Sequence, residues 1–262
     1  MPRFSANLSL LFTEHAVLDR FAAARDAGFE AVEIQFPYDL PVEHWRRAKE
    51  RSGLDFVLFN VPAGDLPKGG AGLAGVPGRE GHFRAAVAEA KHYAEALAPR
   101  AVNVLAGWPS PTVDRDRCRE SLVANLGYAA DVMSSLGVRV VVEPINRVDR
   151  PDSLVATSHD GLEILATVGH ANLALQWDAY HMAMMGEDPA ASLPALADKI
   201  GHIQFADAPG RQEPGTGAID FDALFTAIDS CAYEGWVGAE YVPSGATRDS
   251  LNWLRRRRAR PA

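Results

Sequence analysis

The chain alternates between two kinds of segment along its length, and this alternation restricts its possible folds more than any other feature. Short runs rich in β-branched and aromatic residues are each followed by a longer run with helical periodicity. Strict alternation of this kind implies parallel strands joined by helical crossovers. Eight such units are present, the number that closes a (β/α)8 TIM barrel as a single α/β domain.

The expected elements follow from these runs. Strands are expected at Phe4–Phe12, Ala31–Pro37, Asp55–Pro62, Ala101–Gly107, Arg139–Asn146, Leu173–His181, His202–Asp207 and Trp236–Val242. Helices are expected at Val17–Ala27, Pro41–Arg51, Glu80–Ala98, Asp114–Leu136, Ser158–Val168, Pro189–Asp198 and Phe221–Tyr233, with an eighth ending near Arg255. An open doubly wound sheet is the main alternative, but no Gly-x-Gly-x-x-Gly sequence follows the first strand, where a dinucleotide site would need it.

Composition narrows the class of protein. A chain of 262 residues with 47% hydrophobic residues can form a large core, which excludes intrinsic disorder. The net charge of −8 disfavours nucleic acid as a partner. We expect one domain over residues 1–262, in which residues 255–262 form a disordered basic tail. Homo-oligomer formation stays open.

Localisation is expected to be cytoplasmic. Cys118 and Cys231 form no CxxC pair and no disulfide framework, as is usual for reduced cytosolic thiols. The amino-terminal stretch is broken by polar residues and does not resemble a signal peptide. Apolar runs are too short to cross a membrane.

The longest expected loop, residues 63–80, follows the third strand and contains six glycines. It lacks the Gly-Lys-Ser/Thr ending of a phosphate-binding loop. Long loops in compact domains are often functional, and this loop lies on the face where barrel active sites form. We interpret it as a candidate lid, with a tolerated insertion as the alternative.

Four polar residues interrupt the apolar strands near their carboxyl ends and are spaced by about one βα repeat. They are Glu143, Asp178, Gln204 and Glu240, on the fifth to eighth strands. Three carboxylates converging inside a barrel mouth repel one another and lose hydration, unless a cation neutralises them. A set of oxygen ligands suits Mg²⁺ or Mn²⁺ better than zinc, which prefers nitrogen and sulfur. The sequence therefore predicts a divalent metal site.

Three further residues are candidates for substrate binding. His181 follows Asp178 by three residues and can donate a hydrogen bond to a substrate oxygen. Arg211 lies in a loop that follows the seventh strand and can bind a substrate carboxylate through two hydrogen bonds. Asn103, near the end of the fourth strand, is the third candidate.

Several of these segments together resemble the hydroxypyruvate isomerase family, within the xylose isomerase-like superfamily of sugar isomerases and epimerases. The resemblance spans essentially the whole chain. It is carried by Phe59–Asp65, Pro77–Glu80, Val102–Gly107, Val140–Asn146, Gln176–Met182, His202–Gly217 and Gly238–Tyr241. It implies that Glu143, Asp178, Gln204 and Glu240 bind the metal and that the two glutamates, Glu143 and Glu240, are the acid–base pair.

The resemblance implies conversion of hydroxypyruvate to 2-hydroxy-3-oxopropanoate through an enediolate. Such a reaction needs a base and an acid on two sides of the substrate and a cation for the developing charge. Alternatives are isomerisation of a 2-oxo-tetronate, or isomerisation or epimerisation of another small sugar or sugar acid. More remote alternatives are an AP endonuclease, whose trinuclear zinc site is rich in histidine, and a non-catalytic sugar-acid binding protein.

Overall fold

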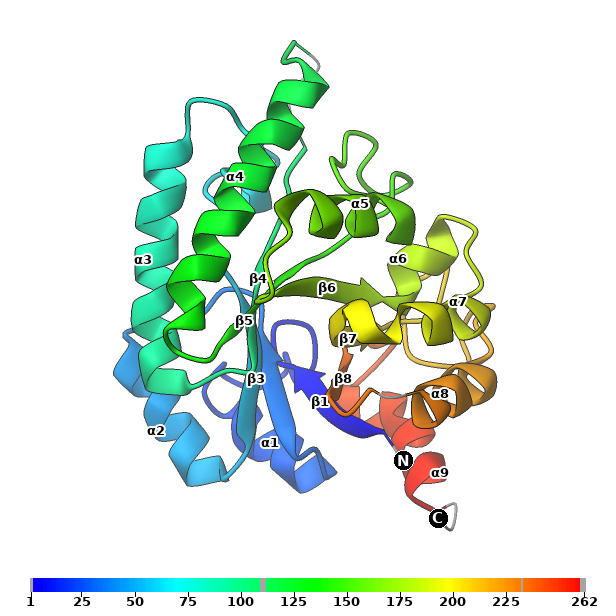
Figure 1. Cartoon of the computed structure of the whole chain (residues 1–262). Helices are drawn as coiled ribbons and strands as arrows, with labels where there is room; N and C mark the ends of the chain where they lie inside the picture. Colours follow the sequence, from blue (N-terminus) through cyan, green and yellow to red (C-terminus); the bar gives the residue numbers. More distant parts are fainter. Residues whose placement is uncertain (1, 109–111, 232, 260–262) are drawn as a thin grey trace.

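The computed structural model describes residues 2–108, 112–231 and 233–259 and forms a closed barrel of parallel strands (Figure 1). The strands follow one another around the barrel in chain order, and Arg3 of the first strand pairs with Trp236 of the last. They are β1 (Arg3–Asn7), β2 (Ala31–Ile34), β3 (Asp55–Asn60), β4 (Ala101–Val104), β5 (Arg139–Val142), β6 (Leu173–Asp178), β7 (Ile200–Phe205) and β8 (Trp236–Ala239). The predicted (β/α)8 barrel is therefore confirmed.

Helices surround the barrel and cover its outer surface (Figure 1). They are α1 (Arg20–Ala27), α2 (Val42–Ser52), α3 (Glu80–Leu97), α4 (Arg115–Ser134), α5 (Ser158–Val168), α6 (Ala179–Met184), α7 (Pro189–Leu196), α8 (Phe221–Ser230) and α9 (Asn252–Ala259). Local sequence sets several helix ends. The Asp114 carboxylate caps α4 by accepting from two backbone N–H groups, and Gly169 ends α5 with a left-handed φ of 62°.

The interior of the barrel changes from apolar to polar along its axis. Near the amino ends of the strands it is filled by a separate cluster of buried apolar side chains, which includes Ala31, Ala101, Val141 and Trp236. Toward the carboxyl ends the inward positions become polar, as the next section describes. The apolar layer closes the bottom of the barrel, so a ligand can enter from the carboxyl-end face.

The strand ends differ from the sequence-based expectation. Most strands end earlier than predicted, because the chain leaves the barrel ladder and forms loops around its mouth; β1, for example, ends at Asn7 rather than Phe12. The expected strand Leu173–His181 ends at Asp178, and its last residues begin the short helix α6. The Asp178 carboxylate caps that helix by accepting from the Tyr180 N–H at 2.9 Å.

The expected disordered tail is wrong for residues 255–259, which belong to α9. Trp253 and Leu254 are buried in the core and anchor this helix. The Arg257 guanidinium pairs with Asp229 at 3.0 Å, and Arg258 bonds to the Gly28 carbonyl. Residues 260–262 lie outside the described residues. Within the described part of the chain, no helix is long and apolar enough to cross a membrane.

Candidate active site

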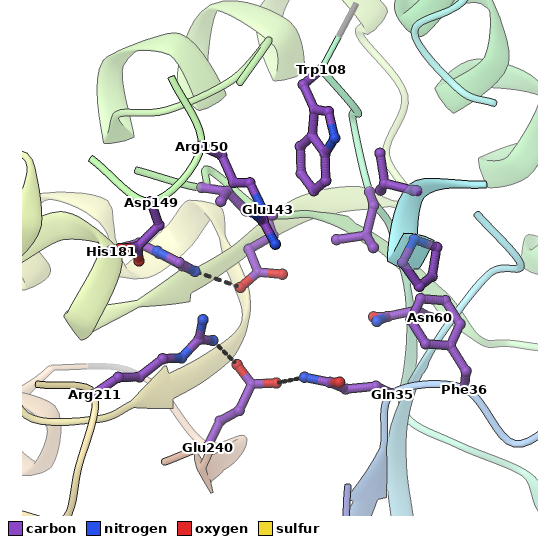
Figure 2. Close-up of a pocket in the computed structure, with 14 residues that line it drawn as sticks. Gln35, Phe36, Asn60, Trp108, Glu143, Asp149, Arg150, His181, Arg211 and Glu240 are labelled. Atoms are coloured by element: carbon purple, nitrogen blue, oxygen red, sulfur yellow. Dashed lines mark hydrogen bonds and ion pairs between the residues drawn. The ribbon is translucent and has the colours of Figure 1, made fainter. Parts of the chain in front are cut away.

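Three buried carboxylates lie at the carboxyl ends of β5, β6 and β8. Glu143 directly follows β5, Asp178 is the last residue of β6, and Glu240 directly follows β8. Figure 2 shows Glu143 and Glu240 directed toward each other across a cavity. The structure thus brings together the acidic residues that the sequence pattern selected.

Burial and mutual repulsion disfavour the charged forms of these groups. Burial, followed by the charges of Glu240 and Asp178, raises the pKa of Glu143 well above its ordinary value. Burial raises the pKa of Asp178 to about 7 and also raises the pKa of Glu240. An arrangement that is this unfavourable for three anions calls for a positive partner.

The arrangement fits a divalent cation. Asp178 Oδ2 is buried and has no hydrogen-bond partner in the described part of the protein. Glu143, Asp178 and His181 each offer a potential ligand atom, and these atoms lie within 4.8 Å of one another. A carboxylate oxygen left without a partner beside a second carboxylate is the chemistry expected of a cation site.

Gln204, the fourth predicted ligand, lies in β7 with both ends of its amide engaged by the protein. Its Oε1 accepts from Gln176 Nε2, and its Nε2 donates to Glu33 Oε1 at 2.7 Å. To ligate a metal, the Gln204 oxygen would have to exchange its bond to Gln176. Its place in the ligand set therefore stays a prediction.

Glu33, in β2, is a buried carboxylate that the sequence analysis did not single out. It accepts from Ser5 Oγ at 3.2 Å and from Gln204, and its Oε2 lies 2.8 Å from His202 Nε2. Gly238 lies against it, since a Cβ at that position would approach a Glu33 oxygen to 2.5 Å. An acidic residue within the apolar run Ala31–Ile34 was the available signal.

The ring of His181 is oriented by Asn146. The Asp149 N–H donates to Asn146 Oδ1 at 2.8 Å, which turns the Asn146 Nδ2 toward His181 Nδ1 at 2.7 Å. Burial, and then the charge of Arg211, lowers the pKa of His181 well below its ordinary value. A neutral ring that accepts at Nδ1 carries its proton on Nε2, which lies 3.7 Å from Glu143 and 3.8 Å from Asp178.

Arg211 neutralises part of this acidic group. Its Nη2 donates to Glu240 Oε2 at 2.8 Å and lies 3.8 Å from Asp178 Oδ2. Burial alone would lower the pKa of Arg211, but Glu240, Asp178 and Glu143 raise it. Its backbone adopts a left-handed φ of 52°, uncommon for a residue with a side chain, as the loop folds over the barrel mouth.

Amide side chains from β1 to β4 support the two glutamates. Asn7 Nδ2 and Gln35 Nε2 donate to Glu240 Oε1 at 2.8 and 3.0 Å. Asn103 Nδ2 donates to Glu143 Oε2 at 2.9 Å. Asn103 is fully buried beneath Glu143 and is not among the residues that line the cavity, so its predicted contact with substrate stays a prediction.

The cavity itself has a volume of about 560 Å³, which suits a small organic ligand. It is lined by Gln35, Phe36, Asn60, Leu66, Pro67, Leu105, Trp108, Glu143, Ile145, Asp149, Arg150, His181, Arg211 and Glu240 (Figure 2). Leu66 and Pro67 belong to the glycine-rich loop, where Asp65 pairs with Arg79 at 3.0 Å. This loop borders the cavity as expected, and its closure over a ligand stays a prediction.

Known proteins are similar to this chain in sequence and in fold. A family model described as xylose isomerase-like TIM barrel matches residues 21–257. A 2-oxo-tetronate isomerase from Cupriavidus necator and a hydroxypyruvate isomerase from Escherichia coli are each 42% identical, over 97% of this chain and 98% of theirs. A solved structure described as AP endonuclease, family 2, from Brucella melitensis is 38% identical and superposes with a TM-score of 0.94, covering 98% of this chain and 99% of that one.

Proposed function

Because the chain belongs to the xylose isomerase-like TIM barrel family and is an isomerase, we propose that it interconverts a short 2-oxo acid and its 3-oxo isomer. The first substrate to test is hydroxypyruvate, which would give 2-hydroxy-3-oxopropanoate. A 2-oxo-tetronate is the second, because relatives with both names match this chain equally well. The observation that carries the proposal is the pair Glu143 and Glu240, which face one cavity from two directions.

The two glutamates would move the proton between adjacent carbons. One carboxylate removes the proton from C3, which carries the hydroxyl group, and the second glutamate delivers a proton to C2, the former carbonyl carbon. A proton also passes from the C3 hydroxyl to the C2 oxygen, so the product is an isomer and no electrons leave the substrate. His181 Nε2–H, beside Glu143, and Arg211, beside Glu240, would donate to the substrate oxygens.

A divalent metal, Mg²⁺ or Mn²⁺, is the proposed cofactor. Glu143, Asp178 and Glu240 would hold it, with Gln204 as a fourth ligand once its oxygen is released. We assign His181 to hydrogen bonding, because Asn146 fixes its Nδ1 as an acceptor. A bound divalent cation stabilises negative charge on two neighbouring substrate oxygens.

Localisation and partners follow as further proposals. We place the protein in the cytoplasm as a single domain that acts on small keto acids, with Asn103 as an additional residue near the substrate. Nucleic acid is not a proposed partner, because the net charge is −8.

A substrate panel tests this function. Hydroxypyruvate, a 2-oxo-tetronate and C3 to C6 sugars are incubated with Mg²⁺, Mn²⁺ or chelator, and isomer formation is followed by NMR in D₂O. We expect turnover of the 2-oxo acids with the metal present. Turnover of neutral sugars alone would reject the substrate class. In a separate assay, nicking of abasic DNA would favour the endonuclease alternative.

A further inference from the structure

A second arginine, Arg150, borders the cavity, and no carboxylate within the described part of the chain pairs with it. Arg150 lies in the loop after β5, and its guanidinium carbon stands 5.1 Å from the centre of the Trp108 ring. Among the described residues, no ion pair or side-chain hydrogen bond involves this guanidinium. Figure 2 shows Arg150 and Trp108 on the side of the cavity away from Glu240 and Gln35.

Arg211 and Arg150, the two arginines of the cavity, therefore differ in how freely their guanidinium groups can bind a ligand. The Arg211 charge is already shared with Glu240 and Asp178, at 2.8 and 3.8 Å. Arg150 has an aromatic face beneath it and open cavity beside it. Stacking on Trp108 restricts the long side chain and leaves the edges of the guanidinium free to donate two parallel hydrogen bonds.

A 2-oxo acid would meet an electrostatic problem in this cavity. Its reacting carbons must face Glu143 and Glu240, so the carboxylate attached to C2 would lie next to these acidic groups unless another part of the cavity binds it. The favourable orientation directs the substrate carboxylate away from these groups and toward a cation that they do not neutralise. Arg150 is a lining residue that meets this requirement.

We propose that Arg150, held by Trp108, binds the substrate carboxylate and makes the site selective for 2-oxo acids over uncharged ketoses. This inference rests on the proposed isomerase function and identifies Arg150 as the group that makes the enzyme selective for this substrate class. Anchoring the carboxylate at Arg150 leaves C2 and C3 to face Glu143 and Glu240. Arg211 then acts on the reacting oxygens rather than on the carboxylate.

The test compares a charged substrate with its neutral analogue. Dihydroxyacetone has the same reacting carbons as hydroxypyruvate but carries CH₂OH in place of the carboxylate. For Arg150→Met we expect kcat/KM with hydroxypyruvate to fall about 10–100-fold, mainly through KM, as loss of a charged hydrogen-bonding partner predicts. Turnover of dihydroxyacetone should change less than about twofold, and Arg150→Lys should recover part of the loss.

Arg147→Met is the matched control. Arg147 lies in the same loop, pairs with Asp160 at 3.1 Å and does not line the cavity, so both substrates should be handled as by the wild type. Melting temperature and metal content of each variant are measured alongside. An unchanged KM of Arg150→Met for hydroxypyruvate, or equal losses with both substrates, overturns the role of Arg150 and leaves the isomerase function intact.

A wild-type protein that does not convert any 2-oxo acid would instead reject the proposed function. Calorimetric titration with hydroxypyruvate then tests Arg150 separately. Binding that is weakened in Arg150→Met but not in Arg147→Met supports the carboxylate site. Equal binding by the two variants, or no binding by the wild type, overturns it.

Discussion

The two halves of the barrel mouth use different chemistry at equivalent positions. Strands β5, β6 and β8 end in the carboxylates Glu143, Asp178 and Glu240, whereas β1 to β4 present amides at Asn7, Gln35, Asn60 and Asn103. The amides donate to carboxylates on adjoining strands, as in the pairs Asn7–Glu240, from β1 to β8, and Asn103–Glu143, from β4 to β5. One half thus concentrates the carboxylates that reach the site, and the other orients them mainly through amides. Glu33 of β2 is a buried carboxylate in the second half, but it is bonded to Gln204 and His202 and does not line the cavity.

This difference indicates a division of roles. Groups that gain or lose protons, or that hold a cation, lie on the acidic half. The amide half fixes those groups in place through neutral hydrogen bonds, so that a carboxylate oxygen remains directed at the cavity. Substitutions in the two halves should therefore differ in size and in kind of effect.

Removing the proposed cation should have the largest effect. Without it, the buried carboxylates of the acidic half are left in mutual repulsion, so excess chelator should abolish isomerase activity and Mg²⁺ or Mn²⁺ should restore it. Asp178→Asn should weaken metal affinity, measured by calorimetry. Full activity in excess chelator, with no metal found by elemental analysis, would contradict the metal site.

Glu143→Gln and Glu240→Gln should each reduce kcat by about 10²–10⁴-fold, the range for loss of one general acid or base. The double variant should lose less than the product of the two, because both groups act in one proton-transfer sequence. Stopped assays with metal-loaded variants measure these losses. If a variant keeps near-normal kcat with metal bound, the replaced glutamate is a metal ligand only and takes no part in proton transfer.

Asn103→Ala tests the amide half and should reduce kcat or metal affinity about 10–100-fold, typical of groups that orient metal ligands. The loss arises because the Glu143 carboxylate is no longer held at 2.9 Å by the Asn103 amide. Asn172→Ala is a control, since its amide donates to the Ala130 and Val138 carbonyls away from the cavity. That control should lower the melting temperature and keep kcat; equal kcat in both variants would remove the distinction between the halves.

The smallest expected effect concerns pH and stability. Burial raises the Asp178 pKa from 3.8 to about 7, so the folded protein binds a proton that the unfolded chain releases. The stability from this group is present below about pH 4 and is lost as the pH rises through about 7. Metal-free protein should therefore melt at a lower temperature at pH 8 than at pH 5, and Asp178→Asn should reduce the decline. A metal-free wild type with the same slope as the variant would contradict the raised pKa.

The acidic half could be predicted from the sequence because its signal is local. A carboxylate at the end of an apolar run is conspicuous, and one βα repeat separates it from the next. Asn7, Gln35 and Asn60 gave no such signal, since an amide at a strand end is an ordinary polar residue. Asn103 was selected, but as a substrate contact rather than as a donor to Glu143.

The sequence by itself determined the barrel. Each strand and helix is indicated by the residue pattern of a short segment, and their alternation implies parallel pairing of the strands. It also determined which strands carry Glu143, Asp178 and Glu240, although not that β2 carries Glu33. Only the tertiary structure decided which side chains meet: Asn7 and Glu240 are 233 positions apart, and closure of β1 against β8 brings them to 2.8 Å. Likewise, the fold paired Arg211 with Glu240 and placed Arg150 on Trp108, where no acidic group of residues 2–108, 112–231 and 233–259 pairs with it. Contacts of this kind depend on where the closed barrel directs each side chain, and no local pattern in the chain records that.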